Sequence, residues 1–270
     1  MTRSFVLVTD LDGTLVDAPP FPLLHNFNRA WAARPPDSLL VYNTGRSLQS
    51  YLHLLSTAPL LTPDILVCSV GTEIYRFNNK FCSWQKDLAY CHTLDASGWD
   101  RDALVTAASG VFGLAMQQAS EQRPHKISLS ATERRPAATM SPETWQAALS
   151  ALRAALAATG VPHHVVASAG HDVDILPPGV HKGSAVLSVL SGYCVATGMT
   201  PAEAAACTLC CGDSGNDAAM LETSGTHACV VGNAHPELLA WAQTQGDRVY
   251  VAQGRCSAGI LEAMAHFKLG

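Results

Sequence analysis

The sequence contains few charged residues and no concentration of basic ones. Charged side chains make up 14% of the 270 residues, well below the roughly 25% usual in globular proteins. The formal net charge is −5, whereas proteins that bind nucleic acids or membrane surfaces need grouped Lys and Arg side chains. We therefore expect neither a nucleic-acid partner nor a membrane partner.

Three further features are missing from the sequence. No apolar run is long enough to cross a bilayer, and no G-x-x-x-x-G-K-[ST] loop is present, which disfavours a nucleoside triphosphatase. No signal peptide precedes the first strand-like run. The nine cysteines are odd in number and many lie in apolar runs, a pattern typical of reduced thiols. We expect a protein of a reducing compartment, either the cytoplasm or an organellar stroma.

Apolar residues, by contrast, are plentiful at 48% of the chain. This content and the length suit one large domain or a core with a smaller second domain. The run from Phe5 to Val8 has the pattern of a buried strand. Further strand-like runs lie at 39–43, 65–69, 207–211, 227–231 and 249–251, and helical patterns lie between them. The alternation predicts an α/β fold with a doubly wound parallel, Rossmann-like sheet.

The pattern changes in the middle of the chain, where aromatic and polar residues mix from about residue 84 onward. A helical pattern, short alternating runs and an alanine- and leucine-rich helical stretch follow one another there. This block predicts a smaller α/β unit inserted into the sheet. We therefore expect a catalytic core of residues 1–85 and 175–270, and an inserted domain of residues 86–174.

The first strand leads into Asp10-Leu11-Asp12-Gly13-Thr14. Ligands bind at the carboxyl edge of open α/β sheets, and side chains two apart on a strand point the same way. Two carboxylates held together repel each other, so they need a cation or a shared proton. The simpler alternative is an Asp-rich turn that follows an N-terminal strand.

Three later motifs favour chemistry over that alternative, because Thr44, Lys182 and Asp213 each lie at a strand end or a helix start. Together they supply what phosphoryl transfer through a carboxylate requires. Asp10 can attack phosphorus, and Asp12 can protonate the leaving alcohol. Thr44, the amide of Gly45 and Lys182 can neutralise phosphate oxygens. Asp10, Asp213 and a carbonyl near Asp12 can hold Mg²⁺.

These motifs, with Gly212-Asp213-Ser214-Gly215-Asn216-Asp217, resemble those of the haloacid-dehalogenase-like phosphatases. The resemblance implies Asp10 as nucleophile, Asp12 as acid and base, and Mg²⁺ at Asp10, Asp12, Asp213 and Asp217. It implies that Asn216 orients Lys182 or the phosphate. It also implies that the insert is the α/β cap, or substrate-specificity, domain of that superfamily.

A closer resemblance is to the sucrose-phosphate phosphatases. It rests on Ser69-Val70-Gly71-Thr72-Glu73, Lys126-Ile127-Ser128, His171-Asp172-Val173-Asp174 and Asn233-Ala234-His235-Pro236. It implies hydrolysis of sucrose 6-phosphate, with Glu73, Lys126, His171 and Asp172 as substrate-binding candidates. His171 stands where that family is expected to have Lys, and we expect the chain to lack the plant-type C-terminal extension. The chain resembles the short members of the family, those without this extension, and we expect it to be a monomer.

Other functions stay open at this point. One is a phosphatase for another sugar or glycosyl phosphate, such as trehalose phosphate or mannosylglycerate phosphate. Another is a non-catalytic sugar-phosphate-binding partner of sucrose-phosphate synthase, with which association is also expected on resemblance alone. The intact set of Asp10, Asp12, Lys182 and Asp213 argues against the non-catalytic alternative.

Overall fold

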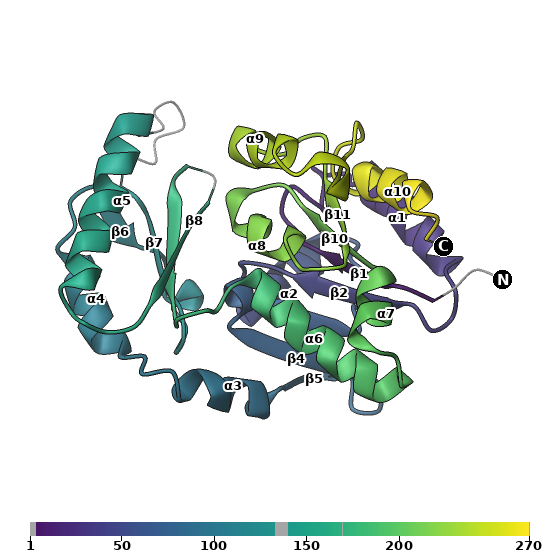
Figure 1. The fold of residues 1–270 in the computed structure, drawn as a ribbon, viewed down its shortest axis with the longest axis horizontal. Coiled ribbons are helices and arrows are strands. Elements are labelled where there is room, and N and C mark those ends of the chain that lie inside the picture. The colour runs from purple at the N-terminus through teal and green to yellow at the C-terminus, as the bar shows by residue number, and fades with distance from the viewer. Residues whose placement is uncertain (1–3, 133–139, 169, 270) are drawn as a thin grey trace.

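The computed structural model of the chain describes residues 4–132, 140–168 and 170–269. Figure 1 shows a large core with a smaller cap domain beside it. The core is built on an eight-stranded sheet and the cap on a four-stranded sheet. The predicted fold class, a doubly wound sheet with an inserted smaller α/β domain, is confirmed.

The core sheet has the strand order β12–β11–β10–β1–β2–β3–β4–β5. Its strands are β1 (Val6–Thr9), β2 (Leu39–Asn43), β3 (Ile65–Cys68), β4 (Glu73–Asn78), β5 (Ser83–Lys86), β10 (Thr208–Gly212), β11 (His227–Val230) and β12 (Val249–Val251). The strands from β12 to β3 pair in parallel. Strand β4 pairs antiparallel with β3 on one side and with β5 on the other; the predicted parallel sheet lacked this β4–β5 hairpin.

Helices cover both faces of the core sheet (Figure 1), because right-handed crossovers that lead to opposite sides of β1 place their helices on opposite faces. The core and its connections contain α1 (Pro22–Ala32), α2 (Leu48–Thr57), α3 (Leu88–Asp95), α6 (Lys182–Thr197), α7 (Pro201–Ala206), α8 (Ala218–Leu221), α9 (Pro236–Gln243) and α10 (Ser257–His266). Helices α1 and α10 pack together, and α6 packs against α7 and α8 (Figure 1). Within the described ranges, no helix is both long and apolar enough to cross a membrane.

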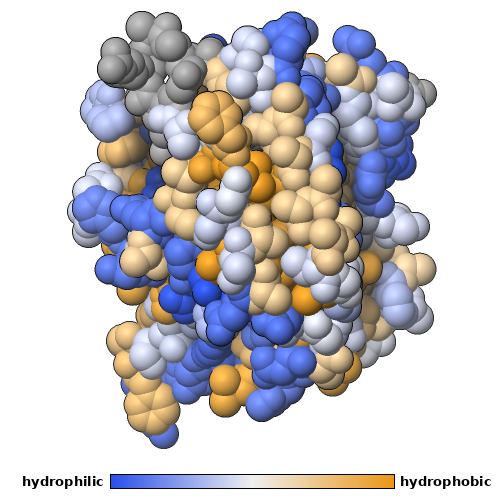
Figure 2. Space-filling model, turned by 90° about the vertical axis from the view of Figure 1, so that its left-hand side faces the viewer, coloured by the Kyte–Doolittle hydropathy of each residue, from blue (hydrophilic) through white to orange (hydrophobic). Residues whose placement is uncertain are grey.

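The cap has its own sheet and its own hydrophobic core. Its sheet has the antiparallel order β6–β7–β9–β8. The elements are β6 (Leu114–Met116), β7 (Ile127–Ala131), β8 (His164–Ser168), β9 (Asp172–Leu176), α4 (Arg101–Ser109) and α5 (Pro142–Ala157). The apolar side chains of the sheet pack with those of α4 and α5. Figure 2 views the cap from outside, where apolar and polar side chains intermix.

Side-chain alternation gives the cap sheet one apolar and one polar face. Ile127 and Leu129 join the hydrophobic core of the cap, while Ser128 hydrogen-bonds to Asp174, and Ser130 to Asp172. The polar face therefore carries two carboxylates.

The two domains meet at a small apolar cluster. It combines Val70 of the core, Leu94 of α3, Leu176 at the end of β9, and Val180 from the connection between β9 and α6. Both chain connections to the cap thus pass through one buried contact, which seats the cap over the carboxyl edge of the core sheet.

Candidate active site

Three aspartates gather at the carboxyl edge of the core sheet. Asp10 follows β1 and Asp213 follows β10, and these strands are parallel neighbours with Thr9 opposite Cys211. One oxygen of each of Asp10, Asp213 and Asp217 lies within 4.8 Å of the other two. All three residues are buried. The parallel register therefore unites motifs that lie about two hundred residues apart.

Lys182, the first residue of α6, lies under this cluster and is 1% exposed. Its Nζ donates to Asp10 Oδ1 and to Asp217 Oδ1, each at 2.7 Å. Asp217 Oδ2 accepts from the backbone amides of Asp213 and Ser214, both at 3.0 Å. Asp217 thus holds both the lysine and the loop that carries Asp213.

Burial of several like charges determines the electrostatics of the cluster. Burial raises the pKa of Asp10 well above its ordinary value; Lys182 opposes this rise and the neighbouring aspartates add to it. Burial and the Asp217 carboxylate raise the pKa of Asp213 to about 6. Burial lowers the pKa of Lys182, but Asp10 and Asp217 outweigh that effect and raise it overall. One ammonium among three carboxylates leaves a site that favours a further cation.

The turn after Asp12 brings its backbone against Asp213. Gly13 has φ +76°, and a Cβ there would collide with Asp213 Oδ2, so the turn requires glycine. Thr14 Oγ1 donates to Asp213 Oδ1 at 2.9 Å, and Asn233 Nδ2 donates to the Gly13 carbonyl at 2.7 Å. The turn is held from both sides.

Asp12 is paired with a residue of the second motif. Arg46 Nη2 and Nε donate to the two carboxylate oxygens of Asp12, each at 2.7 Å. The neighbouring Thr44 is 1% exposed, and its Oγ1 accepts from the Arg46 amide at 3.1 Å. Its hydroxyl hydrogen therefore remains available to donate.

A polar cavity of about 480 Å³ lies between core and cap. From the core it is lined by Asp10, Asp12, Gly45, Arg46, Ser50, Asp213, Ser214, Asn216 and His235, and from the cap by Gln117, Glu121, Lys126, Ser168, Asp172 and Asp174. This volume is in the range of small-molecule sites. Its walls carry both carboxylates and cations.

The candidate residues from the sequence fall into three groups. Asp10, Asp12, Gly45, Asp213, Asn216, Lys126 and Asp172 line the cavity. Thr44, Lys182 and Asp217 are buried beside its lining. Glu73 and His171, which are both described, lie outside that lining: Glu73 is in a buried ion-pair group, and His171 lies 3.5 Å from Asp172 on the β8–β9 turn.

Sequence reasoning did not assign roles to Arg46, Glu121 and Asp174. Asp174 could have been found, because it lies two residues after Asp172 on one strand and therefore shares its face. Arg46 directly follows the Thr44-Gly45 motif, which is a weaker signal. No periodicity marks Glu121, because it lies in a short 3₁₀ turn, Ala119–Glu121.

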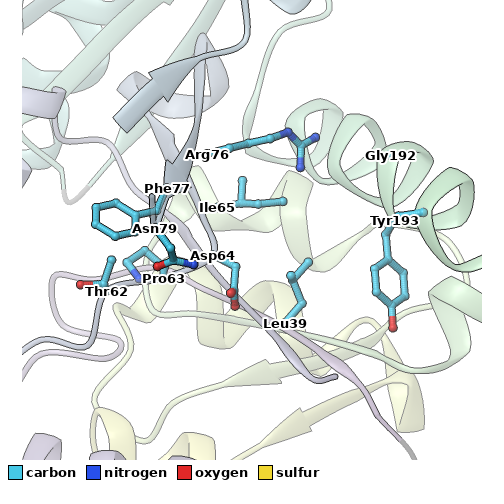
Figure 3. Close-up of a pocket in the computed structure, with 11 residues that line it drawn as sticks. Leu39, Thr62, Pro63, Asp64, Ile65, Arg76, Phe77, Asn79, Gly192 and Tyr193 are labelled. Carbon is cyan, nitrogen blue, oxygen red and sulfur yellow. The ribbon is translucent and has the colours of Figure 1, made fainter. Parts of the chain in front are cut away.

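A second cavity, of about 340 Å³, lies at the other edge of the core sheet (Figure 3). Leu39 and Ile65, which line it, begin β2 and β3. These are the amino ends of strands whose carboxyl ends face Asp10. None of the described residues assigned to phosphate chemistry lines this cavity.

The motifs and their geometry agree with a family model described as sucrose-6F-phosphate phosphohydrolase, which matches residues 3–268. The chain belongs to this family. A probable sucrose-phosphatase 2 of Arabidopsis thaliana is 39% identical over 98% of this chain and 60% of its own length. The chain thus spans about 60% of the length of the plant relatives that it matches.

Other relatives match over nearly their full length. The mannosylfructose-phosphate phosphatase of Agrobacterium fabrum is 31% identical, over 98% of this chain and 97% of its own. The solved structure of the sucrose-phosphatase from Synechocystis sp. PCC6803, in complex with sucrose and phosphate, has a TM-score of 0.82 and 35% identity, and covers 98% of both chains.

Proposed function

We propose that this protein is a Mg²⁺-dependent phosphomonoesterase that hydrolyses sucrose 6-phosphate to sucrose and phosphate through an aspartyl-phosphate intermediate. The observation that carries the proposal is the buried group Asp10, Lys182, Asp213 and Asp217 at the floor of a polar cavity. The names of the plant and cyanobacterial relatives support sucrose 6-phosphate as the substrate.

Asp10 is the proposed nucleophile. Among the described residues, Lys182 alone donates a side-chain hydrogen bond to its carboxylate. An Asp10 oxygen forms a bond to phosphorus while the phosphorus–oxygen bond to the sugar breaks. Protonated Asp12 supplies the proton that the leaving alkoxide takes up. Because Arg46 holds the Asp12 carboxylate in this structure, Asp12 has to leave Arg46 to become that acid.

The second half of the reaction reverses these roles. Asp12, now a carboxylate, takes a proton from water as the water oxygen bonds to phosphorus. The bond between phosphorus and Asp10 breaks, which restores the free carboxylate and releases phosphate. Thr44, the Gly45 amide, Lys182 and Asn216 are the proposed donors to the phosphate oxygens, whose negative charge needs such fixed partners.

The oxygen-rich donor set of the site fits Mg²⁺, which prefers carboxylate, carbonyl and water ligands. We propose that Asp10 and Asp213 and the Asp12 carbonyl hold the ion. The oxygens of Asp217 already accept from Lys182 and from two amides, so its role is chiefly to position them. When bound, the metal neutralises the carboxylate charge so that a phosphate dianion can approach.

The cap, for which we propose residues 86–174 apart from Lys86, which ends β5 of the core sheet, supplies the sugar-binding surface. Lys126 and Asp172 line the cavity opposite the phosphate motifs, together with Gln117, Ser168 and Asp174. Sugar hydroxyls need paired donors and acceptors, and a buried polar group left unpaired is costly. A disaccharide of matching shape therefore pairs more of these cap donors and acceptors than a smaller sugar does.

The test is phosphate release from a panel of phosphate esters, with and without Mg²⁺. The panel contains sucrose 6-phosphate, mannosylfructose phosphate, trehalose 6-phosphate, mannosylglycerate phosphate and fructose 6-phosphate. We expect sucrose 6-phosphate to have the highest kcat/KM and activity to be lost in EDTA. Equal turnover of fructose 6-phosphate would remove the disaccharide claim.

Two other outcomes identify the alternatives. Preference for mannosylfructose phosphate would favour the activity named for the Agrobacterium relative, which matches almost end to end. Binding without turnover of any ester would favour a sugar-phosphate-binding partner of sucrose-phosphate synthase. Size-exclusion chromatography with light scattering, alone and with the synthase, tests the proposed monomer and the association.

A further inference from the structure

Glu73 is a buried carboxylate that the proposed chemistry does not use. Its side chain is 1% exposed. Lys86 Nζ donates to Oε1 at 2.7 Å, and Arg123 donates to Oε1 at 3.0 Å and to Oε2 at 3.1 Å. A buried charge persists only with such partners, so these two cations account for the ionised state of Glu73.

The two cations come from different domains. Lys86 lies on β5, which pairs with β4, the strand of Glu73. Arg123 lies in the cap, between the turn Ala119–Glu121 and β7. Burial raises the pKa of Glu73, but the hydrogen bonds from Arg123 and Lys86 outweigh it and lower the pKa overall. The contact between Glu73 and Arg123 therefore joins core to cap through a carboxylate that is buried in the core.

Arg123 is linked in turn to Lys126. The Arg123 amide donates to the Lys126 carbonyl at 3.0 Å, and the Lys126 amide donates back to the Arg123 carbonyl at 3.2 Å. Lys126 Nζ donates to the carbonyl of Gly45, in the second phosphate motif, at 2.8 Å. Because these two backbone hydrogen bonds tie the residues together, a shift of Arg123 would also shift the backbone of Lys126, from which its side chain extends to Gly45.

The same cap segment reaches the core at another point. The Ser47 amide donates to Glu121 Oε2 at 3.2 Å, and Ser47 Oγ donates to Oε1 at 3.4 Å. Ser47 is the N-cap of α2. Residues 121–126 therefore contact the core at Glu73, Gly45 and Ser47, and the last two flank Arg46, the partner of Asp12.

We propose that Glu73 is a positioning residue for hydrolysis of the sugar phosphate. By holding Arg123, it keeps residues 121–126 aligned over the phosphate motif, so that the cap wall and the core motif form one cavity. The proposal rests on the proposed function for its substrate. It predicts that Glu73 matters for esters whose sugar contacts the cap and not for a small aryl phosphate.

The test compares sucrose 6-phosphate with 4-nitrophenyl phosphate in Glu73→Gln, Arg123→Gln and the double variant. We expect kcat/KM for the sugar phosphate to fall at least tenfold in each single variant, mainly through KM. Turnover of 4-nitrophenyl phosphate should change less than threefold. The double variant should lose no more than either single variant, because both remove the same contact.

Lys86→Gln is the matched control. Lys86 binds the same carboxylate, and its side chain is 29% exposed against 31% for Arg123, but its contact stays within the core. We expect Lys86→Gln to retain selectivity for the sugar phosphate. Equal losses on both substrates, or the same defect in Lys86→Gln as in Arg123→Gln, would show a structural role within the core and overturn the proposal.

Hydrogen–deuterium exchange supplies a readout that is independent of activity. Amides of residues 121–126 and of Ser47 should exchange faster in Glu73→Gln and Arg123→Gln than in Lys86→Gln or the parent protein. Unchanged exchange would overturn the positioning role, whatever the substrate. Faster exchange in these two variants, combined with a parent protein that hydrolyses no sugar phosphate, would retain this role and reject the proposed function. Should Glu73→Gln fail to fold, the more exposed Arg123→Gln still decides the question.

Discussion

The raised pKa of Asp213 makes Mg²⁺ binding depend on pH in a calculable way. The ordinary value for an aspartate is 3.8, and burial with the Asp217 carboxylate raises that of Asp213 to about 6. A proton therefore competes with the metal for this carboxylate near pH 6. The test is to lower the pH from 7 to 5 at constant ionic strength and to measure the Mg²⁺ affinity at each pH.

The magnitude follows from the proton occupancy of one carboxyl group. With a pKa of about 6, Asp213 is roughly nine-tenths ionised at pH 7 and one-tenth ionised at pH 5, so protonation of this group should lower the Mg²⁺ affinity about tenfold, and the raised pKa of Asp10 acts in the same direction. The rise from 3.8 to about 6 is ~3 kcal/mol. The pKa of Asp213 is higher in the folded than in the unfolded chain, so its protonated form favours folding. This contribution to the stability of the metal-free protein is fully present below pH 4 and is lost as pH rises through 6.

Isothermal titration calorimetry in two buffers of different ionisation enthalpy measures both the affinity and the protons released. From Asp213 we expect about half a proton released per Mg²⁺ near pH 6, close to one near pH 5 and little at pH 8. Asp172→Asn, which removes a cavity carboxylate outside the cluster, is the control and should keep the same pH dependence. Equal affinity at pH 5 and pH 7, or unweakened binding by Asp213→Asn, would refute the reasoning.

Three further predictions concern single residues. Asp10→Asn should release no phosphate while its circular dichroism spectrum and melting temperature stay near those of the parent; retained turnover would remove Asp10 as nucleophile. Gly13→Ala should cost ~1–3 kcal/mol of stability and weaken Mg²⁺ binding, because the turn has φ +76° and abuts Asp213; an unchanged affinity measured by calorimetry contradicts this. Lys126→Met removes the hydrogen bond to Gly45 and should raise KM for sucrose 6-phosphate about tenfold, since losing a charged hydrogen bond costs ~1.5–3 kcal/mol; an unchanged KM argues against the assigned contact.

The parallel strands of the core could be predicted because each is short, apolar and followed by a turn. The strand predicted at residues 39–43 coincides with β2, and the Ser47 hydroxyl caps the helix that follows it. The hairpin β4–β5 was missed. Its outer strand is only partly buried, so it lacks the continuous apolar run by which the buried parallel strands were found.

The motifs proposed for phosphate chemistry could be assembled from the sequence because strand ends of a parallel sheet meet at one edge. Which residues of the cap line the cavity could not be predicted in this way. Lys126 and Asp172 line the cavity as expected, whereas Glu73 points into an ion-pair group with Arg123 and Lys86. Both arrangements place a polar residue near the domain boundary, and nothing in local sequence distinguishes them.

The sequence by itself thus determined the parallel strands of the core, the order of the motifs along the chain and the residues proposed for phosphoryl transfer, since these depend on local periodicity and on one topological rule. Only the tertiary structure decided which carboxylates face the cavity and which hold the cap in place. That choice depends on how two separately packed domains meet, through contacts such as Glu73 with Arg123 and Lys126 with Gly45, between residues fifty or more positions apart. No local sequence pattern indicates which residue pairs with a buried charge.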